Sequence, residues 1–324
     1  MLTIIDGGLQ TLVQDLGRKE YYHLGVPPSG AADKYSYLLG NILLGNPHDY
    51  AALEITMLGP KIEVRKKTVI AITGAPVEVL HNGQPAPMWE TISVQEGDII
   101  SFKAASRGVK TYLCVSGGIQ VPDVLGCKST YTLSHLGGFK GRKLVAGDDV
   151  PIGEPLPGVF HHVGKRIPDE FIPEFPASAD IRVVMGISSY RLSDEGIKAF
   201  LDSEWRVGLE SNNVAYRYTG ARVAFKPLDP PFGTGSNSSN AVDIVYPVGA
   251  IMVTNEEELI LLLRDATTGG GYVTIGTAIN ADLDLIAQSR PHATTRFLAV
   301  TVDQAIAARL QKKKRLLAVQ DLLR

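Results

Sequence analysis

Three stretches of the sequence combine polar side chains with glycines in patterns that could do chemistry. The first, VQDLGRKEYYHLGVPPSGAAD at residues 13–33, brings Asp15, Arg18 and Ser29 towards a predicted helix start. Unpaired N–H groups at such a start, here at Ser29 or Gly30, bind carboxylates, phosphates or developing oxyanions. An aspartate could move a proton there, and the arginine could hold an anion. The alternative is structural, a capped helix with Asp15 and Arg18 as a local ion pair.

The second stretch, DATTGGGY at residues 265–272, follows an apolar run and contains three consecutive glycines. In a loop, these glycines could present backbone N–H groups into a concavity, with the hydroxyls of Thr267 and Thr268 beside them. Asp265 could accept a proton or orient an amide. A plain hairpin turn is the alternative, and Tyr272 is then expected to pack at the exit of the loop.

The third stretch, GCKSTYTLSHLGGFKGRKLVAGD at residues 126–148, resembles the end of a phosphate-binding loop only superficially. A cysteine separates its glycine from its lysine and the upstream glycine is missing, which excludes a Walker A nucleotide site. Lys128, Ser129, Thr130 and Arg142 could still line an anionic pocket. A surface loop is the alternative.

Bulk properties limit the classes of function. Of the 324 residues, 44% are hydrophobic, which is typical of a globular protein. The formal charge is -2, so the chain lacks the excess of basic residues that would indicate nucleic-acid binding. Cys114 and Cys127 lack disulfide or metal spacing, which indicates buried thiols in a reducing compartment and no metal site. No signal peptide or long apolar run is present, so we expect a cytoplasmic protein without a membrane span. The motifs of hydrolase triads, zincins, thiol-redox and dinucleotide-binding proteins are absent.

The elements that must position these residues are mainly strands. Turn signals separate five expected strands, at 61–64, 69–73, 77–80, 98–102 and 111–116. Asn82–Gly83 predicts a two-residue hairpin turn. A helix over 31–44 is expected after the Ser29–Gly30 cap. In a strand-like run beyond it, Glu54 faces away from its apolar neighbours, either to the surface or into a cleft.

A proline-rich passage at 151–176 predicts a connector between two domains, with a boundary near residue 165. Beyond it we expect a strand at 181–185 and a helix from Ser193 to about Trp205. Strands follow to about residue 302, and a last helix covers 303–324. The pattern predicts antiparallel barrels or sandwiches with few helices.

Taken in order, the motifs resemble one family across nearly the whole chain. They read GLQTLVQDLGR…GVPPSGAADKYSYLLGNILLGNP…ALE, then GCKST…LGGFKGRKLVAGD, then GAIMVTNEEELILLLRDATTGGGYVTIGTAINADL. The chain is similar to the biotin-dependent carboxyltransferase family. That family includes the C-type subunit of bacterial 5-oxoprolinase, the second carboxyltransferase subdomain of urea carboxylase, proteins like the second subunit of allophanate hydrolase and the antagonist of a sporulation kinase inhibitor. The resemblance implies a mainly β fold of two cyclophilin-like β-barrel subdomains, 1–165 and 166–324, with a few peripheral helices.

The resemblance also implies the residues of the site. Asp15, Arg18, Asp33 and Thr268 would be catalytic. The matching substrate-binding positions are Ser29, Gly30, Asn41, Glu54, Ser129, Thr130, Gly137, Gly138, Thr267, Gly269, Gly270 and Tyr272. Three segments depart from the family pattern and bear on the choice of substrate, namely the third glycine before Tyr272, SNNVAYRYTG at 211–220 and VTNEEELILLL at 253–263.

The functions implied are those of one chain in a larger assembly. The first is a heteromeric amide-processing enzyme, an ATP-dependent 5-oxoprolinase that opens 5-oxoproline to glutamate. The second is the carboxyltransferase component of a biotin-dependent urea or amide carboxylase, and the third is a non-catalytic regulatory protein that antagonises a kinase inhibitor. Prolyl isomerisation, by analogy with cyclophilin, has no sequence motif behind it.

The cofactors and partners follow from the same resemblance. The implied partner is a shorter, related subunit that shares the active-site cleft, the B-type subunit in the oxoprolinase case, with a third TIM-barrel-like subunit or a biotin carrier. ATP would act at the level of the complex. The chain lacks a biotin-accepting Met-Lys-Met, so biotin would arrive on another protein.

Overall fold

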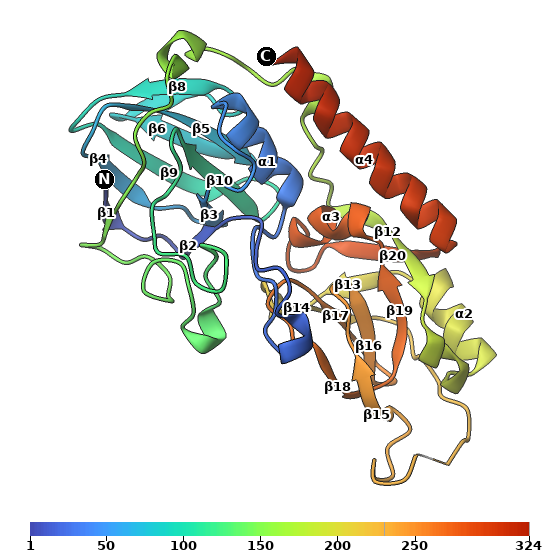
Figure 1. Cartoon of the computed structure of the whole chain (residues 1–324). Helices are drawn as coiled ribbons and strands as arrows, with labels where there is room; N and C mark the ends of the chain where they lie inside the picture. The colour runs from blue at the N-terminus through green and yellow to red at the C-terminus, as the bar shows by residue number, and fades with distance from the viewer. Residues whose placement is uncertain (230, 324) are drawn as a thin grey trace. The chain divides into compact units, whose positions relative to one another are not determined.

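The computed structural model describes residues 1–229 and 231–323, and the chain forms two compact units that interleave in sequence (Figure 1). The first, which we call unit 1, contains residues 1–19, 29–175 and 313–324, and unit 2 contains residues 20–28 and 176–312. A domain boundary near residue 165 stays a prediction. Within the described ranges, no helix has both the length and the apolar character needed to cross a membrane.

Unit 1 is built on two antiparallel sheets whose inward side chains form one core. The first has the order β11 (Asp149–Val150), β1 (Leu2–Asp6), β4 (Lys61–Val64), β9 (Ile99–Ala105), β6 (Val77–His81) and β7 (Gln84–Ala86). The second has the order β2 (Gln10–Gln14), β3 (Ala52–Thr56), β10 (Lys110–Val115), β5 (Thr68–Gly74) and β8 (Thr91–Val94). Leu2 and Ile62 from the first sheet pack with Leu53 and Ile72 from the second. All five expected strands are present.

The predicted hairpin turn is confirmed between β6 and β7. Asn82 and Gly83 have φ values of 51° and 79°. Two consecutive positive φ values are what a two-residue turn needs to match the twist of the strands it joins. The local sequence signal is sufficient here because the turn depends on these two residues alone.

Helix α1 (Lys34–Leu43) covers the outer face of the second sheet, against β5 and β10 (Figure 1). It begins three residues later than the sequence predicts. Asp33, not Ser29 or Gly30, is the N-cap, and its side chain accepts a hydrogen bond from Ser36 N at 3.0 Å. Ser29 and Gly30 have φ values of 52° and 88°, so they turn the chain before the helix starts.

Unit 2 is a closed barrel. Its strand order is β12 (Ser178–Met185), β19 (Thr274–Ala278), β16 (Ala250–Asn255), β17 (Glu258–Leu262), β14 (Ala215–Thr219), β13 (Trp205–Val207) and β20 (Thr294–Ala299), and β20 closes the barrel by pairing in parallel with β12. The rings of Phe200 and Phe297 stack in its core at 4.8 Å, beside Trp205. Helix α2 (Asp194–Asp202) starts after the predicted Ser193 cap but ends before Trp205, which belongs to β13.

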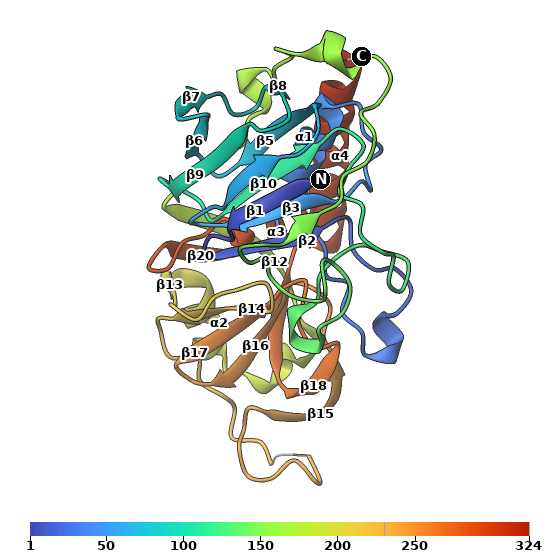
Figure 2. The ribbon, with the colours of Figure 1, turned by 90° about the vertical axis from the view of Figure 1, so that its left-hand side faces the viewer.

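The glycine-rich stretch of unit 2 is a strand, and the loop predicted there is wrong. Strand β18 (Gly269–Tyr272) pairs with β15 (Asn240–Val245) in a separate two-stranded sheet (Figure 2). Glycine is a poor strand former, but a Cβ on Gly270 would lie 2.8 Å from the Tyr246 ring. The absence of a side chain therefore allows the strand to lie against that ring.

The remaining elements are helical and short, except for the last. They are η1 (Tyr22–Leu24), η2 (Thr132–Ser134), η3 (Val159–His162), η4 (Asp169–Phe171), η5 (Ile187–Arg191), η6 (Asn280–Asp282), α3 (Leu283–Ala287) and α4 (Val302–Leu322). Helix α4 is the terminal helix expected from the sequence, and residues from Lys313 onwards group with unit 1. Strands outnumber helices along the described chain, which confirms the mainly β class.

Candidate functional site

Asp15 joins two of the three chemically promising stretches within unit 1. It follows β2 directly and is buried. Its Oδ1 accepts hydrogen bonds from Gly17 N at 2.8 Å and from the Ser129 hydroxyl, and its Oδ2 accepts one from Lys128 N at 2.6 Å. Ser129 Oγ in turn accepts from Asp15 N at 3.0 Å. The carboxylate thus holds the 15–18 turn against residues 128–129.

Arg18 lies in the same place with part of its guanidinium group unused. The side chain is 5% exposed, and Nη2 donates to the Ser129 carbonyl oxygen at 2.6 Å. Its Nε and Nη1 are buried and have no hydrogen-bond partner among the described residues. The local ion pair with Asp15, which was the structural alternative, is not formed, because both groups bond to Ser129 instead. A buried cation with unused donors favours an anion nearby, because burial of an unpaired charge is costly.

Two glycines separate Arg18 and Thr130 from a cavity of about 400 Å³ in unit 1. Gly137 has a φ of 66°, and a Cβ there would meet the Ser129 carbonyl and lie 2.6 Å from Arg18 Nη2. A Cβ on Gly138 would collide with the Thr130 side chain. The predicted glycine pair is therefore required for this close approach.

The lining of the cavity mixes apolar and basic groups. It comprises Gln120, Val121, Pro122, Val124, His135, Gly137, Gly138, Phe139, Lys140, Gly141 and Pro151. Lys140 Nζ lies 5.0 Å from the centre of the Phe139 ring. Arg142, which the sequence allowed to line an anionic pocket, is not part of this lining and forms two hydrogen bonds with Asp148, at 2.7 and 2.8 Å. The cavity could hold a small molecule with a negative or strongly polar group.

Ser29 and Gly30 pack against the Asp15 turn. A Cβ on Gly30 would lie 2.8 Å from Gly17 N, and Ala31 N donates to the Asp15 carbonyl at 2.8 Å. The Ser29 hydroxyl is buried and has no partner among the described residues. Residues 20–28 belong to unit 2, and the unit 1 residues on either side of this segment therefore lie against each other at the turn that carries Arg18.

Glu54 belongs to a buried polar network beneath the start of α1. Its Oε2 accepts hydrogen bonds from Ala32 N at 2.8 Å and from the Tyr112 hydroxyl at 2.9 Å, and Lys110 Nζ lies 3.4 Å from Oε1. The Tyr112 hydroxyl also accepts from Asp33 N at 2.9 Å. Burial and then the charge of Glu54 raise the pKa of Tyr112 well above its usual value, so the phenol stays protonated.

Glu54 is fully buried, so of the two positions that strand alternation left open, the surface position is wrong. It is not among the residues that line the Gly137 cavity, which favours a positioning role over contact with substrate. Lys110 and Tyr112 were missed by the sequence reasoning. The available signal was Lys110 at the head of an apolar strand, two residues from Tyr112 and hence on the same face.

Two further predicted site residues are bound within unit 1. Asn41 Nδ2 donates to the Tyr50 carbonyl at 3.0 Å, and its Oδ1 accepts from Asn46 at 2.9 Å. Thr130 Oγ1 donates to the Val13 carbonyl at 2.9 Å. Both side chains are fully buried. Asn41 thus joins α1 to the segment at residues 46–50, and Thr130 joins the third stretch to β2.

The predicted site residues of unit 2 lie around β18. Thr267 is exposed and donates to the Gly269 carbonyl at 2.9 Å, whereas Thr268 is half-buried. Backbone groups of Gly269 and Gly270 belong to the ladder with β15, so they do not form the open N–H cradle predicted. Tyr272, at 40% exposure, is not the packing residue expected. Its N–H donates to the Tyr246 hydroxyl at 2.6 Å.

The cysteines are both buried and free, as the sequence indicates. Burial raises the pKa of the Cys114 and Cys127 thiols, which disfavours the reactive thiolate. Over residues 1–229 and 231–323, no group of three or more His, Cys, Asp or Glu side chains is arranged to hold a metal ion.

Comparison with known proteins gives consistent matches in sequence and fold. The family model for the carboxyltransferase domain, subdomain A and B, matches residues 24–299. Urea amidolyase of Saccharomyces cerevisiae is 33% identical over 305 residues, which cover 92% of this chain and 16% of that protein. The C-type subunit of the 5-oxoprolinase of Haemophilus influenzae is 30% identical over 314 residues, which cover 97% of this chain and 95% of that protein.

The fold agrees with a solved relative. The crystal structure of the Kluyveromyces lactis urea carboxylase superposes with a TM-score of 0.91 at 31% identity, over 98% of this chain and 29% of that chain. The chain thus spans a minor part of the yeast enzymes it matches and nearly all of the bacterial subunit. The range matched by the family model includes the lining of the Gly137 cavity and β18.

Proposed function

The chain belongs to the carboxyltransferase domain family, subdomains A and B, and on this premise we propose that it is one component of a heteromeric amide-processing enzyme. The proposed reaction is the ATP-dependent opening of 5-oxoproline to glutamate. The observation that carries it is mutual coverage, because the alignment with the C-type 5-oxoprolinase subunit of Haemophilus influenzae covers 97% of this chain and 95% of that one.

A second candidate is the carboxyltransferase component of a biotin-dependent urea or amide carboxylase. The TM-score of 0.91 with the Kluyveromyces lactis urea carboxylase favours it. Urea and 5-oxoproline both present a carbonyl bonded to nitrogen. A site that stabilises negative charge on such a carbonyl oxygen would serve either reaction.

We assign the anion-stabilising role in unit 1 to Arg18. Its buried charge lies directly behind Gly137, and two of its nitrogens have no partner among the described residues. Such a fixed, buried charge favours a substrate carboxylate or the oxyanion that forms when the amide carbonyl is attacked. Lys140, at the lining, adds a second positive charge.

The two aspartates predicted to transfer protons are better suited to holding the backbone. The Asp15 carboxylate already accepts three hydrogen bonds, and Asp33 caps α1 through Ser36 N and Oγ. We therefore propose that both are positioning residues. Thr268 of unit 2 keeps the catalytic role proposed for it, since it is half-buried directly before β18.

ATP and biotin are assigned to the complex. The donors that would hold a phosphate at the third stretch, Lys128 N and Ser129 Oγ, are bound to Asp15, so a nucleotide does not fit there. The cavity at Gly137 has a volume and a mixed apolar and basic lining that suit a small amide or the ring of biotin, the carboxyl carrier of the second candidate function. In the proposed mechanism this chain's residues bind and orient the substrate and stabilise its negative charge.

The test is turnover by the chain co-expressed with the related shorter partner and any third component encoded beside it. ATP hydrolysis would be measured with 5-oxoproline, urea and a panel of lactams, with and without a biotin carrier protein. Biotin-independent turnover of 5-oxoproline is the expected result. Strict dependence on biotin would move the chain to the carboxylase branch. Tight partner binding with no response to any amide would overturn both enzyme hypotheses in favour of a regulatory protein.

Variants connect the result to the site. Arg18→Gln and Thr268→Ala should each lower kcat/KM by roughly 100-fold, as removal of one charge-stabilising donor does. Arg107→Gln, at an exposed arginine of unit 1, and Thr219→Ala, at an exposed threonine of β14 in unit 2, are the matched controls. Thermal unfolding checks that each variant folds. Equal activity of Arg18→Gln and Arg107→Gln would contradict the role assigned to Arg18.

A further inference from the structure

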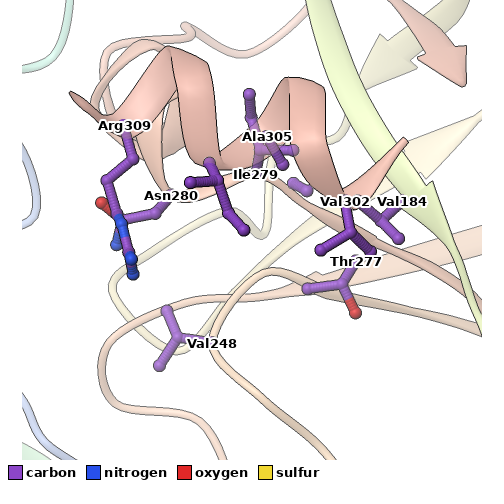
Figure 3. A pocket seen from close by; sticks show the side chains of 10 residues that line it. Val184, Val248, Thr277, Ile279, Asn280, Val302, Ala305 and Arg309 are labelled. Atoms are coloured by element: carbon purple, nitrogen blue, oxygen red, sulfur yellow. The ribbon is translucent and has the colours of Figure 1, made fainter. Parts of the chain in front are cut away.

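A second, open cavity of about 260 Å³ lies in unit 2 beside the first half of α4 (Figure 3). Val184, Val248 and Ile279 form part of its wall from the barrel side. Among the described residues, no acidic side chain lines it. It shares no residue with the cavity at Gly137, and neither the family resemblance nor the proposed reaction makes use of it.

The wall from α4 is one face of that helix. Val302, Ala305, Ile306 and Arg309 follow the spacing i, i+3, i+4, i+7, which places them on a single stripe. Such a stripe normally packs against its neighbour, yet Val302 remains 59% exposed and Ile306 43% exposed. The helix points apolar side chains at the barrel without filling the space between them.

At the next turn, α4 is held to unit 2 by polar contacts. Lys312 forms an ion pair with Asp284 and donates to the Ala281 carbonyl at 3.2 Å. Both partners belong to unit 2. A space held open by an anchored helix is available to an occupant that brings its own apolar surface.

One end of the cavity is polar and positively charged. Arg309 from α4 and Asn280 from η6 both line the cavity, and Figure 3 shows them towards the same end of it. Among the described residues, neither side chain has a hydrogen-bond or ion-pair partner. Arginine and amide N–H groups together match the two oxygens of a carboxylate.

We propose that this cavity binds a small aliphatic carboxylate, with its hydrocarbon part against the apolar wall and its carboxylate on Arg309 and Asn280. Volume limits the size, because pockets for drug-sized molecules start at about 300 Å³. Apolar contact supplies the attraction and the single cation selects the charge. Amines of the same length are disfavoured, and alcohols lack the ion pair.

The proposal is tested by methyl NMR of the full chain during titration with sodium hexanoate. Saturable shifts of the Val184, Val248 and Ile306 methyl signals are expected. Arg309→Gln should weaken binding roughly fivefold, the upper range for a partly exposed ion pair. Lys314→Gln, at an exposed lysine further along α4, is the control and should leave binding unchanged.

Two further measurements separate this site from unspecific binding. Ala305→Leu should fill the cavity and abolish the shifts while thermal unfolding stays close to that of the parent protein. Hexanol and hexylamine should bind more weakly than hexanoate. The proposal is overturned if hexanoate gives no saturable shifts up to its solubility limit, if hexanol binds equally well, or if Arg309→Gln binds like the parent.

Discussion

Glu54 and Lys110 carry opposite charges inside unit 1, and removal of one charge should destabilise that unit strongly. Glu54 Oε1 lies 3.4 Å from Lys110 Nζ, and the side chains are 0% and 4% exposed. At an effective dielectric constant of about 20, unit charges at this separation attract by roughly 5 kcal/mol. Desolvation of both groups offsets part of this, and the loss of one partner of a buried pair costs about 3–5 kcal/mol. We expect Glu54→Gln to lower the free energy of unfolding of unit 1 by about 3 kcal/mol.

The two tryptophans make the measurement specific to one unit. Trp89 lies in unit 1 and Trp205 in unit 2. In a Trp205→Phe background, urea unfolding followed by fluorescence therefore reports on unit 1. Glu63→Gln is the matched control, because it breaks a pair with Arg65 that is 24% and 47% exposed. Exposed pairs of this kind contribute about 1 kcal/mol or less.

A double variant decides whether charge is the cause. Glu54→Gln with Lys110→Met leaves neither charge unpaired, so it should recover much of the stability lost in the single variant. The reasoning is refuted if Glu54→Gln costs no more than the Glu63 control. It is also refuted if the double variant is no more stable than Glu54→Gln alone.

Three further changes test local features, each by urea unfolding. Gly137→Ala should lower the free energy of unfolding by more than about 2 kcal/mol, because the alanine would have a positive φ and its Cβ would also collide with its neighbours. Gly126→Ala has a positive φ but open space around it, so it should lower the free energy of unfolding by about 1 kcal/mol. Equal losses in the two variants would refute the collision. Hydrogen bonds from Arg142 lower the pKa of Asp148, so Asp148→Asn should destabilise unit 1 at neutral pH. That difference should vanish as the pH falls through the lowered pKa, below about 4, and a pH-independent difference would contradict it. Ser193→Ala removes the N-cap of α2 and should lower the free energy of unfolding by about 1 kcal/mol. An unchanged free energy of unfolding would contradict the role of this cap.

Features that depend on a few neighbouring residues could be predicted from the sequence. The Asn82–Gly83 turn and the Ser193 cap are examples, since each is decided by local backbone geometry. The start of α1 could not be chosen in the same way. Ser29 and Asp33 are both good caps, and only the positive φ of Ser29 in the folded chain excludes it.

Features that depend on distant segments could not be predicted. Alternation along β3 places Glu54 on the face of the sheet opposite to that of its apolar neighbours. Both faces of this sheet are covered, however, one by the core and one by α1. Its partner Tyr112 comes from a strand 58 residues away. Likewise, the glycines of β18 have low strand propensity, and their pairing depends on the ring of Tyr246. The predicted roles of the site residues remain predictions.

The interleaving of the two units has a consequence for anyone who dissects this chain. A cut near residue 175 would deprive unit 1 of Val319 and Leu323, which pack in the cluster beneath α1, and would leave Tyr22 without the Tyr246 carbonyl it binds in unit 2. Each fragment would expose surface that the intact chain covers. Fragments expressed separately should therefore fold poorly. An isolated unit would need all of its own segments, supplied either by a re-ordered chain or by co-expression of the missing segment.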